Sequence, residues 1–186
     1  MTGRMITVTG GARSGKTRHA TELVEAMGVP VAYLATASAS DPEMAARIRQ
    51  HRSERPQHWL TIEEPSDLAA ALRSSDLPQP CAILVDCLTV WLGGFVCPLY
   101  DLPEQVARDR LPDVEAAALA AIDDLCNDRS GDRSLVVVTN EVGDGIVPAD
   151  PLTRFYRDTL GRINQKVAAA SDEVYLLVAG LPLKIK

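Results

Sequence analysis

Short runs of apolar and β-branched residues alternate along this chain with longer segments that mix apolar and polar positions. Apolar runs without polar alternation are typical of strands covered on both faces, and strands alternating with helices predict a mostly parallel sheet with right-handed crossovers. The chain is therefore predicted to be a single α/β domain over residues 1–186. The predicted strands are 5–9, 29–35, 82–85, 135–138 and 174–179, with a weaker candidate at 58–62, and the predicted helices are 18–27, 41–55, 66–74, part of 103–126, and 152–170.

Two helix starts carry capping signals. Asp41 is a candidate N-cap followed by a proline at the first helical position, and Ser66 is a possible cap of the shorter helix. The segment 93–103 has the least regular pattern, so it is predicted to be a flap or a contact between subunits.

Composition excludes several classes of protein. A net charge of −6, from 25 acidic and 19 basic residues, argues against sequence-blind binding of nucleic acid. No apolar run reaches the roughly 18 residues that a membrane span needs, and the N-terminal sequence reaches a turn too soon for a signal peptide. We therefore expect a cytoplasmic protein. The cysteines, which lack C-x-x-C spacing, are expected to be reduced and mostly buried: Cys81, Cys87, Cys97 and Cys126.

A phosphate-binding loop follows the first predicted strand and precedes the first predicted helix. Glycines in such a loop let successive backbone N–H groups point at phosphate oxygens, and the helix adds its positive N-terminal end. The lysine reaches the terminal phosphates, and the threonine hydroxyl can bind Mg²⁺. A glycine-rich turn that only connects strand to helix is the alternative. The residues that fit G-x-x-x-x-G-K-[ST] are Gly10, Gly11, Ala12, Arg13, Ser14, Gly15, Lys16 and Thr17.

An acid at the end of a neighbouring strand usually organises Mg²⁺ beside such a loop. Asp86, directly after the run 82–85, is the first candidate, and a cap for the segment starting at Leu88 is its alternative role. Glu141, after the run 135–138, is the competitor, because both lie where ligands bind in open α/β sheets. A role of Asn140 and Glu141 in placing a substrate hydroxyl or Mg²⁺ is a hypothesis, with a loop anchor as the alternative.

The predicted helix 41–55 carries Glu43, Arg47, His51 and Arg55 at steps of four, so these residues share one face. By itself the stripe is typical of a solvated helix surface. Beside a phosphate loop, it also predicts a site where guanidinium groups bind phosphate and a neutral imidazole attacks a nucleotide α-phosphate, forming a phosphoramidate. His19 and His58 have weaker claims, as a helix-surface residue and a packing residue.

These segments together resemble a known family, the bifunctional adenosylcobinamide kinase / adenosylcobinamide-phosphate guanylyltransferases of cobalamin biosynthesis. The resemblance covers nearly the whole chain, and the phosphate loop becomes family-specific in combination with the His-Arg helix and the Asn-Glu-Val-Gly segment. It rests on the segments 10–19, 33–37, 41–52, 55–59, 139–148, 161–165 and 178–186.

The resemblance implies a RecA-like P-loop fold, a homotrimer, and two reactions. The first transfers a γ-phosphate from ATP or GTP to the aminopropanol hydroxyl of adenosylcobinamide. The second moves GMP from GTP onto that phosphate through a guanylylated histidine, His51. Thr17 and Asp86 would hold Mg²⁺. Besides the loop 10–17, the implied nucleotide contacts are Ala35, Thr36, Ala37, Arg52, Ser53, Glu54, Arg55, Glu63 and Asp86.

Two departures from the family pattern are visible. Gln50 stands where many relatives have a first of two histidines, while His51 aligns with the nucleophile, and Asp86 stands where some relatives have Glu. A P-loop kinase without a covalent step is the main alternative function, and a protein–GMP adduct separates the two. A non-catalytic nucleotide switch, which would release neither phosphate nor pyrophosphate, is a third.

Overall fold

The structure is a computed structural model that describes residues 3–38, 42–63, 67–74, 76–128 and 132–186. Of Glu43, Arg47 and Glu54 only the backbone is described. The candidate caps Asp41 and Ser66 therefore lie outside the described residues, as do the side chains of Glu43 and Arg47 in the predicted stripe.

The described elements follow the predicted alternation of strands and helices closely. The strands are β1 (Met5–Gly10), β2 (Val31–Ala35), β3 (Leu60–Glu63), β4 (Cys81–Asp86), β5 (Arg133–Val138), β6 (Glu173–Val178) and β7 (Leu181–Lys184). The helices are α1 (Lys16–Ala26), α2 (Pro42–Glu54), α3 (Leu68–Leu72), α4 (Leu88–Val96), the 3₁₀ helix η1 (Cys97–Asp101), α5 (Glu104–Asn127) and α6 (Pro151–Ala170).

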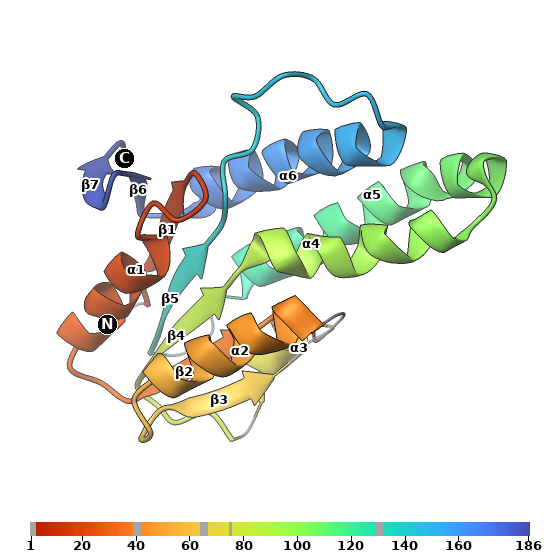
Figure 1. The fold of residues 1–186 in the computed structure, drawn as a ribbon. Coiled ribbons are helices and arrows are strands. Elements are labelled where there is room, and N and C mark those ends of the chain that lie inside the picture. Colours follow the sequence, from red (N-terminus) through yellow and green to blue (C-terminus); the bar gives the residue numbers. More distant parts are fainter. Residues whose placement is uncertain (1–2, 39–41, 64–66, 75, 129–131) are drawn as a thin grey trace.

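The strands form one sheet in the order β3-β2-β4-β5-β1-β6-β7 (Figure 1). Neighbouring strands from β3 to β6 pair in parallel, and only β7 is antiparallel, to β6. The prediction of a mostly parallel sheet is confirmed. Because parallel strands end at one edge, the ends of β1, β4 and β5 meet there, with β5 between the other two.

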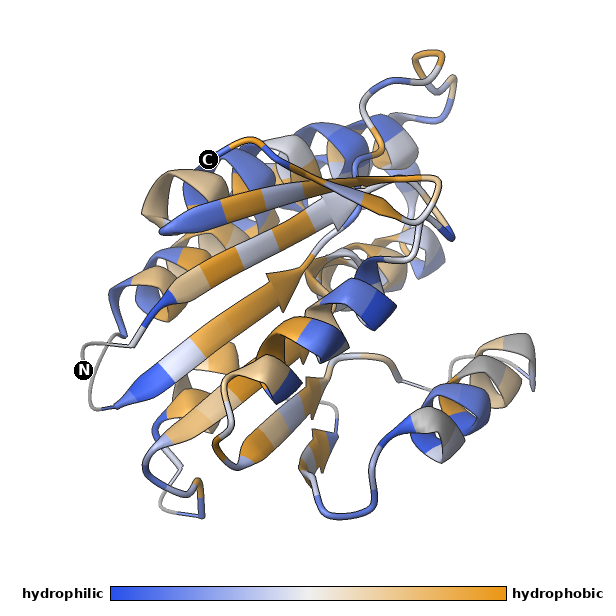
Figure 2. Ribbon diagram, turned by 90° about the vertical axis from the view of Figure 1, so that its left-hand side faces the viewer, coloured by the Kyte–Doolittle hydropathy of each residue, from blue (hydrophilic) through white to orange (hydrophobic). Residues whose placement is uncertain are grey.

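Helices cover both faces of the sheet because its central strands are apolar on both sides. One core packs alternate strand residues such as Leu34, Ile83 and Val137 against α3, α4, α5 and α6. The other packs Val8 and Leu84, among others, against α1. Figure 2 shows the central strands largely in the colour of apolar residues, while the helices alternate between hydrophilic and hydrophobic residues.

Helix α2 differs from the other helices because it contributes no fully buried side chain among its described residues. His51, Arg52 and Ser53 on its last turn are exposed. Its polar sequence gives it little apolar surface to bury.

Two regions differ from the sequence-based prediction. The irregular segment 93–103 is helical over most of its length, in α4 and η1, and Trp91, Leu92, Val96 and Leu99 there are buried. Strand β7 was not predicted, since its residues are exposed and include Pro182. Helix α3 is capped by the side chain of Asp67, which accepts from the N–H of Ala70.

The cysteines form no disulfide, although only Cys81 is fully buried; Cys87 and Cys126 are half-buried and Cys97 is exposed. The expectation of mostly buried thiols is thus only partly correct. Across the described ranges, every helix is too short or too polar to cross a membrane.

Candidate active site

The phosphate loop joins β1 to α1, and glycines permit its shape. Gly10 has φ +144°, and a Cβ there would lie 2.5 Å from the carbonyl oxygen of Leu177 on β6. Gly15, with φ +95°, is the N-cap of α1. The loop therefore presses against β6 on one side and opens the N-terminal end of α1 on the other, which is the geometry that binds phosphate.

Lys16 is buried at the start of α1, and its Nζ donates to the carbonyl oxygen of Gly11 at 2.6 Å. Burial lowers the pKa of Lys16 below its ordinary value, and the acidic groups of Cys87 and Asp86 oppose part of that shift. The ammonium group is held across its own loop, where phosphate oxygens could replace the carbonyl as its partner.

Asp86 contacts both the phosphate loop and β2. Its Oδ2 accepts hydrogen bonds from the Thr17 hydroxyl at 3.0 Å and from the Tyr33 hydroxyl at 2.6 Å. Burial, followed by the charge of Asp86, raises the pKa of Tyr33 well above its ordinary value, so the phenol stays a donor. Thr17 and Asp86 bring a hydroxyl and a carboxylate together, and oxygen donors of this kind suit Mg²⁺.

A pocket of about 360 Å³ opens beside this carboxylate. His51 at the end of α2 and Thr17 of the phosphate loop both line it, although they are far apart in the sequence. The structure thus brings the predicted histidine and the predicted phosphate loop to one cavity. The lining residues are Thr17, Arg18, Thr21, Tyr33, His51, Arg55, Pro56 and Trp59.

Arg55 is the most distinctive cation of this pocket. Its Cζ lies 3.8 Å from the centre of the Tyr33 ring, a stacking contact between guanidinium and aromatic faces. Its Nε and Nη1 are buried and lack a hydrogen-bond partner among the described residues. Buried N–H groups without partners are costly, so the pocket offers these donors to an anionic ligand.

The other predicted nucleotide contacts are not all gathered at the pocket. Thr36 uses its hydroxyl at the ends of β2 and β4, donating to the Cys87 carbonyl and accepting from the Cys87 N–H, both at 2.8 Å. Arg52 pairs with Glu63 at 3.3 Å, and Ser53 donates to the Gln50 carbonyl. Ala35 is buried, Ala37 is half-buried, and the side chain of Glu54 lies outside the described residues.

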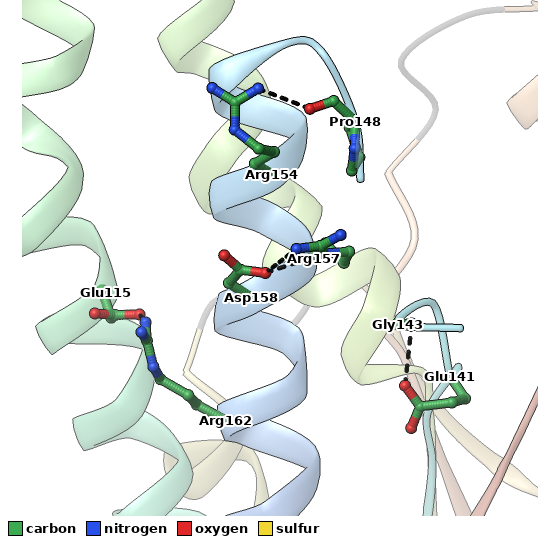
Figure 3. Close-up of polar contacts among 8 residues, drawn as sticks. All are labelled: Glu115, Glu141, Gly143, Pro148, Arg154, Arg157, Asp158 and Arg162. Atoms are coloured by element: carbon green, nitrogen blue, oxygen red, sulfur yellow. Dashed lines mark hydrogen bonds and ion pairs between the residues drawn. The ribbon is translucent and has the colours of Figure 1, made fainter. Parts of the chain in front are cut away.

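The segment after β5 is anchored next to the loop. The N–H of Glu141 donates to the carbonyl of Gly10 at 3.0 Å, and the N–H of Asn140 donates to the Thr89 hydroxyl at 2.8 Å. Figure 3 shows the Glu141 carboxylate turned back toward the N–H of Gly143, at 3.2 Å.

Two pocket residues, Tyr33 and Trp59, were not predicted as site residues. Both are buried, and their ring centres lie 6.3 Å apart. In the sequence each is typical of a core residue. The one sign of a role in the site was that each is the aromatic residue of a segment that carries the family resemblance, 33–37 or 55–59. Of the weaker histidines, His19 packs edge-on against Tyr175 and His58 is exposed, so neither prediction about them was correct.

Comparison with known proteins assigns this chain to a family. The model of the family described as cobinamide kinase / cobinamide phosphate guanyltransferase matches residues 6–185. The chain belongs to this family. As a member, it is a bifunctional kinase and guanylyltransferase acting on cobinamide and cobinamide phosphate, with nucleoside triphosphates as substrates, which confirms the function that the sequence resemblance implied.

Curated members of the family are similar over nearly their whole length. The bifunctional adenosylcobalamin biosynthesis protein CobU of Salmonella typhimurium is 44% identical, covering 98% of this chain and 99% of its own. CobP of Pseudomonas aeruginosa is 42% identical over 96% and 95% of the two chains, and CobU of Escherichia coli is 41% identical over 98% and 99%.

Solved structures with little sequence identity share the fold. A protein from Pyrococcus horikoshii OT3, 9% identical, has a TM-score of 0.55 over 100% of this chain and 87% of that one. An ATPase of a bacterial type III secretion system, 11% identical, has a TM-score of 0.50 over 93% of this chain and 50% of that one. This family member therefore shares the fold of these two proteins, one of which is an ATPase, and the prediction of a mostly parallel sheet flanked by helices is confirmed.

Proposed function

We propose that this family member carries out both reactions in the pocket between the phosphate loop and the end of α2, with His51 as the residue that accepts GMP. The observation that carries the proposal is that His51 and Thr17 line one cavity. A triphosphate held at the loop then presents its γ-phosphate to one acceptor and its α-phosphate to another.

In the kinase reaction, the γ-phosphoryl group of ATP or GTP passes to a hydroxyl of adenosylcobinamide. The N–H groups of the loop, the N-terminal end of α1 and Lys16 hold the phosphates. Thr17 and Asp86 fit Mg²⁺, because their oxygens already lie 3.0 Å apart. Bound there, Mg²⁺ would neutralise charge on the phosphate oxygens.

In the guanylyl transfer, the neutral imidazole of His51 attacks the α-phosphorus of GTP. A bond from nitrogen to phosphorus forms, the bond to the bridging oxygen breaks, and pyrophosphate leaves. The phosphate oxygen of adenosylcobinamide phosphate then displaces the imidazole and takes GMP, giving adenosylcobinamide-GDP. The unpartnered Nε–H and Nη1–H of Arg55 are placed to bind phosphate oxygens during these steps.

The experiment that tests this proposal uses GTP labelled at the α-phosphate. Incubated with the protein and Mg²⁺, it should leave label on the denatured chain that acid removes and base does not. His51→Ala should retain none, whereas His58→Ala, which changes an exposed histidine outside the pocket, should label as the unchanged protein does.

Failure of this experiment has a clear meaning. If cobinamide is phosphorylated but no label remains on the protein, the enzyme transfers GMP without a histidine adduct, and α2 serves only to bind phosphate. If His51→Ala still labels, another residue accepts GMP.

The assembly and location of the protein stay predictions. A homotrimer would have a mass three times that of the chain by light scattering. The exposed apolar side chains of Val178, Leu181, Leu183 and Ile185 at the edge of the sheet supply apolar surface that a subunit contact would cover. Cytoplasmic location and the lack of a nucleic-acid partner rest on composition and resemblance alone.

A further inference from the structure

Glu141 is a carboxylate placed beside an anion-binding loop. Strand β5 lies between β1, which leads into the phosphate loop, and β4, which ends at Asp86. The residues that follow β5 therefore emerge between these two parts of the nucleotide site. The hydrogen bond from the Glu141 N–H to the Gly10 carbonyl, 3.0 Å long, fixes that placement directly.

The backbone that carries Glu141 is held from several sides. The N–H of Asn140 donates to Thr89 on α4, and the Nδ2 of Asn164 on α6 donates to the Asn140 carbonyl at 3.0 Å. The hydroxyl of Thr139, which is buried, donates to the Oδ1 of the same Asn164 at 2.7 Å. A rigid support of this kind is what a group that acts on a substrate needs.

The negative charge of the Glu141 carboxylate has few partners that would stabilise it. Its hydrogen bond comes from the N–H of Gly143 (Figure 3), and across the described ranges no Lys, Arg or His nitrogen lies within 4.0 Å of it. Two arginines drawn in Figure 3 bond to other groups: Arg154 to the Pro148 carbonyl, and Arg157 to Asp158. A negative charge next to a triphosphate site is unfavourable, so its presence there calls for a chemical use.

We infer that Glu141 is the general base of the kinase reaction, an inference that rests on the proposed function. Its carboxylate accepts the proton of the cobinamide hydroxyl while that oxygen bonds to the γ-phosphorus. The bond from the γ-phosphorus to the bridging oxygen breaks, and the nucleoside diphosphate leaves. The proton then passes from Glu141 to water. The attack of His51 on GTP involves a nitrogen without a proton to lose, so it does not need this base.

Two assays separate a role as general base from a structural role: phosphoryl transfer from GTP labelled at the γ-phosphate, and labelling of the protein from GTP labelled at the α-phosphate. With cobinamide as acceptor and saturating Mg²⁺, Glu141→Gln should lower the rate of γ-phosphoryl transfer by roughly 10²–10⁴-fold, the usual contribution of a general base. Labelling of His51 from α-labelled GTP should stay near that of the unchanged protein. The amide oxygen of glutamine can still accept from Gly143, so the turn is preserved.

Two further variants complete the design. Asp144→Asn removes an exposed carboxylate from the same segment and should leave both rates unchanged. Glu141→Asp keeps a base one carbon shorter and should restore part of the phosphoryl transfer.

Three results would overturn the inference. The first is transfer of phosphate by Glu141→Gln at the unchanged rate, and the second is loss of both reactions in equal proportion. The third is full recovery of Glu141→Gln at higher Mg²⁺, which would make Glu141 a positioning residue for the cation. If the unchanged protein itself transfers no phosphate to cobinamide, the proposed function fails, and the variants are not needed to show it.

Discussion

Tyr33 touches both parts of the candidate nucleotide site. Its hydroxyl donates to Asp86 beside the phosphate loop, and its ring supports the Arg55 guanidinium in the pocket of His51. The hydroxyl and the ring thus serve different groups. A substitution that removes only the hydroxyl should affect Asp86 and leave the platform for Arg55 in place.

Tyr33→Phe should raise the Mg²⁺ concentration at half-maximal kinase activity by roughly tenfold, because a hydrogen bond to a charged group contributes about 1.5–3 kcal/mol. Without this donor, Asp86 loses one of the two bonds that orient its Oδ2 toward Thr17. Titration of Mg²⁺ at fixed GTP measures the shift.

A matched control is available in β6. The Tyr175 hydroxyl donates to Glu173 at 2.6 Å, the same length as the bond from Tyr33 to Asp86, but does not line the pocket. Tyr175→Phe should leave the Mg²⁺ requirement unchanged. If both variants shift it alike, the effect comes from stability and not from Asp86.

Among single residues, the sequence allowed us to predict as site candidates those whose chemistry is unusual for their position. Lys16 and Thr17 within a glycine-rich loop, Asp86 at the end of an apolar run, and His51 among arginines all stand out. Tyr33 and Trp59 do not, because aromatic residues are common in strands and cores. Only the fold gives them a place in the site, because it stacks Arg55 on the Tyr33 ring and brings Trp59 close to that ring.

Among the elements, the junction of β1 with the phosphate loop leaves no room for a side chain at Gly10. Gly10 combines φ +144° with the close approach of the β6 backbone, whereas a Cβ on the adjacent Gly11 would meet no atom within 4 Å. The two glycines therefore have different roles in the same turn.

Gly10→Ala should destabilise the protein by about 2–4 kcal/mol, since the new Cβ would force β1 and β6 apart. For a chain of this size, that lowers the melting temperature by roughly 5–15 °C. Gly11→Ala should change stability by no more than about 0.5 kcal/mol. Thermal unfolding without nucleotide tests both, and equal losses would show that the approach of β6 is not what requires Gly10.

The elements that sequence reasoning missed have a common cause. Helix α4 is almost entirely apolar and contains Gly93 and Gly94, so it shows no periodic polar face and has residues that disfavour helices. It forms because Leu88, Trp91 and Leu92 fill the core beneath α5 and α6. Strand β7 depends in the same way on its pairing with β6, which local sequence does not reveal.

For the molecule as a whole, the proposal that one cavity serves both reactions predicts competition between them. The pocket shared by His51 and Thr17 measures about 360 Å³, near the lower end of the roughly 300–1,000 Å³ that single ligands occupy. A guanylyl group on His51 would fill space that a second nucleotide needs.

We expect the guanylylated protein to phosphorylate cobinamide from ATP several-fold more slowly than the same preparation of His51→Ala. The adduct is formed with GTP, free nucleotide is removed, and its stoichiometry is measured by mass spectrometry before the kinase assay. Equal rates at full stoichiometry would mean that the two nucleotides bind in separate places.

The order of the strands in the sheet also determines when the phosphate loop can fold during translation. Strand β1 is synthesised well before its neighbours in the sheet, which are β5 and β6 at residues 133–138 and 173–178. At about 5–20 residues per second, a ribosome needs roughly 10–30 s to travel from the phosphate loop to β6. Until then the loop lacks the backbone it presses against, so a nascent chain should bind GTP only after β6 has been translated.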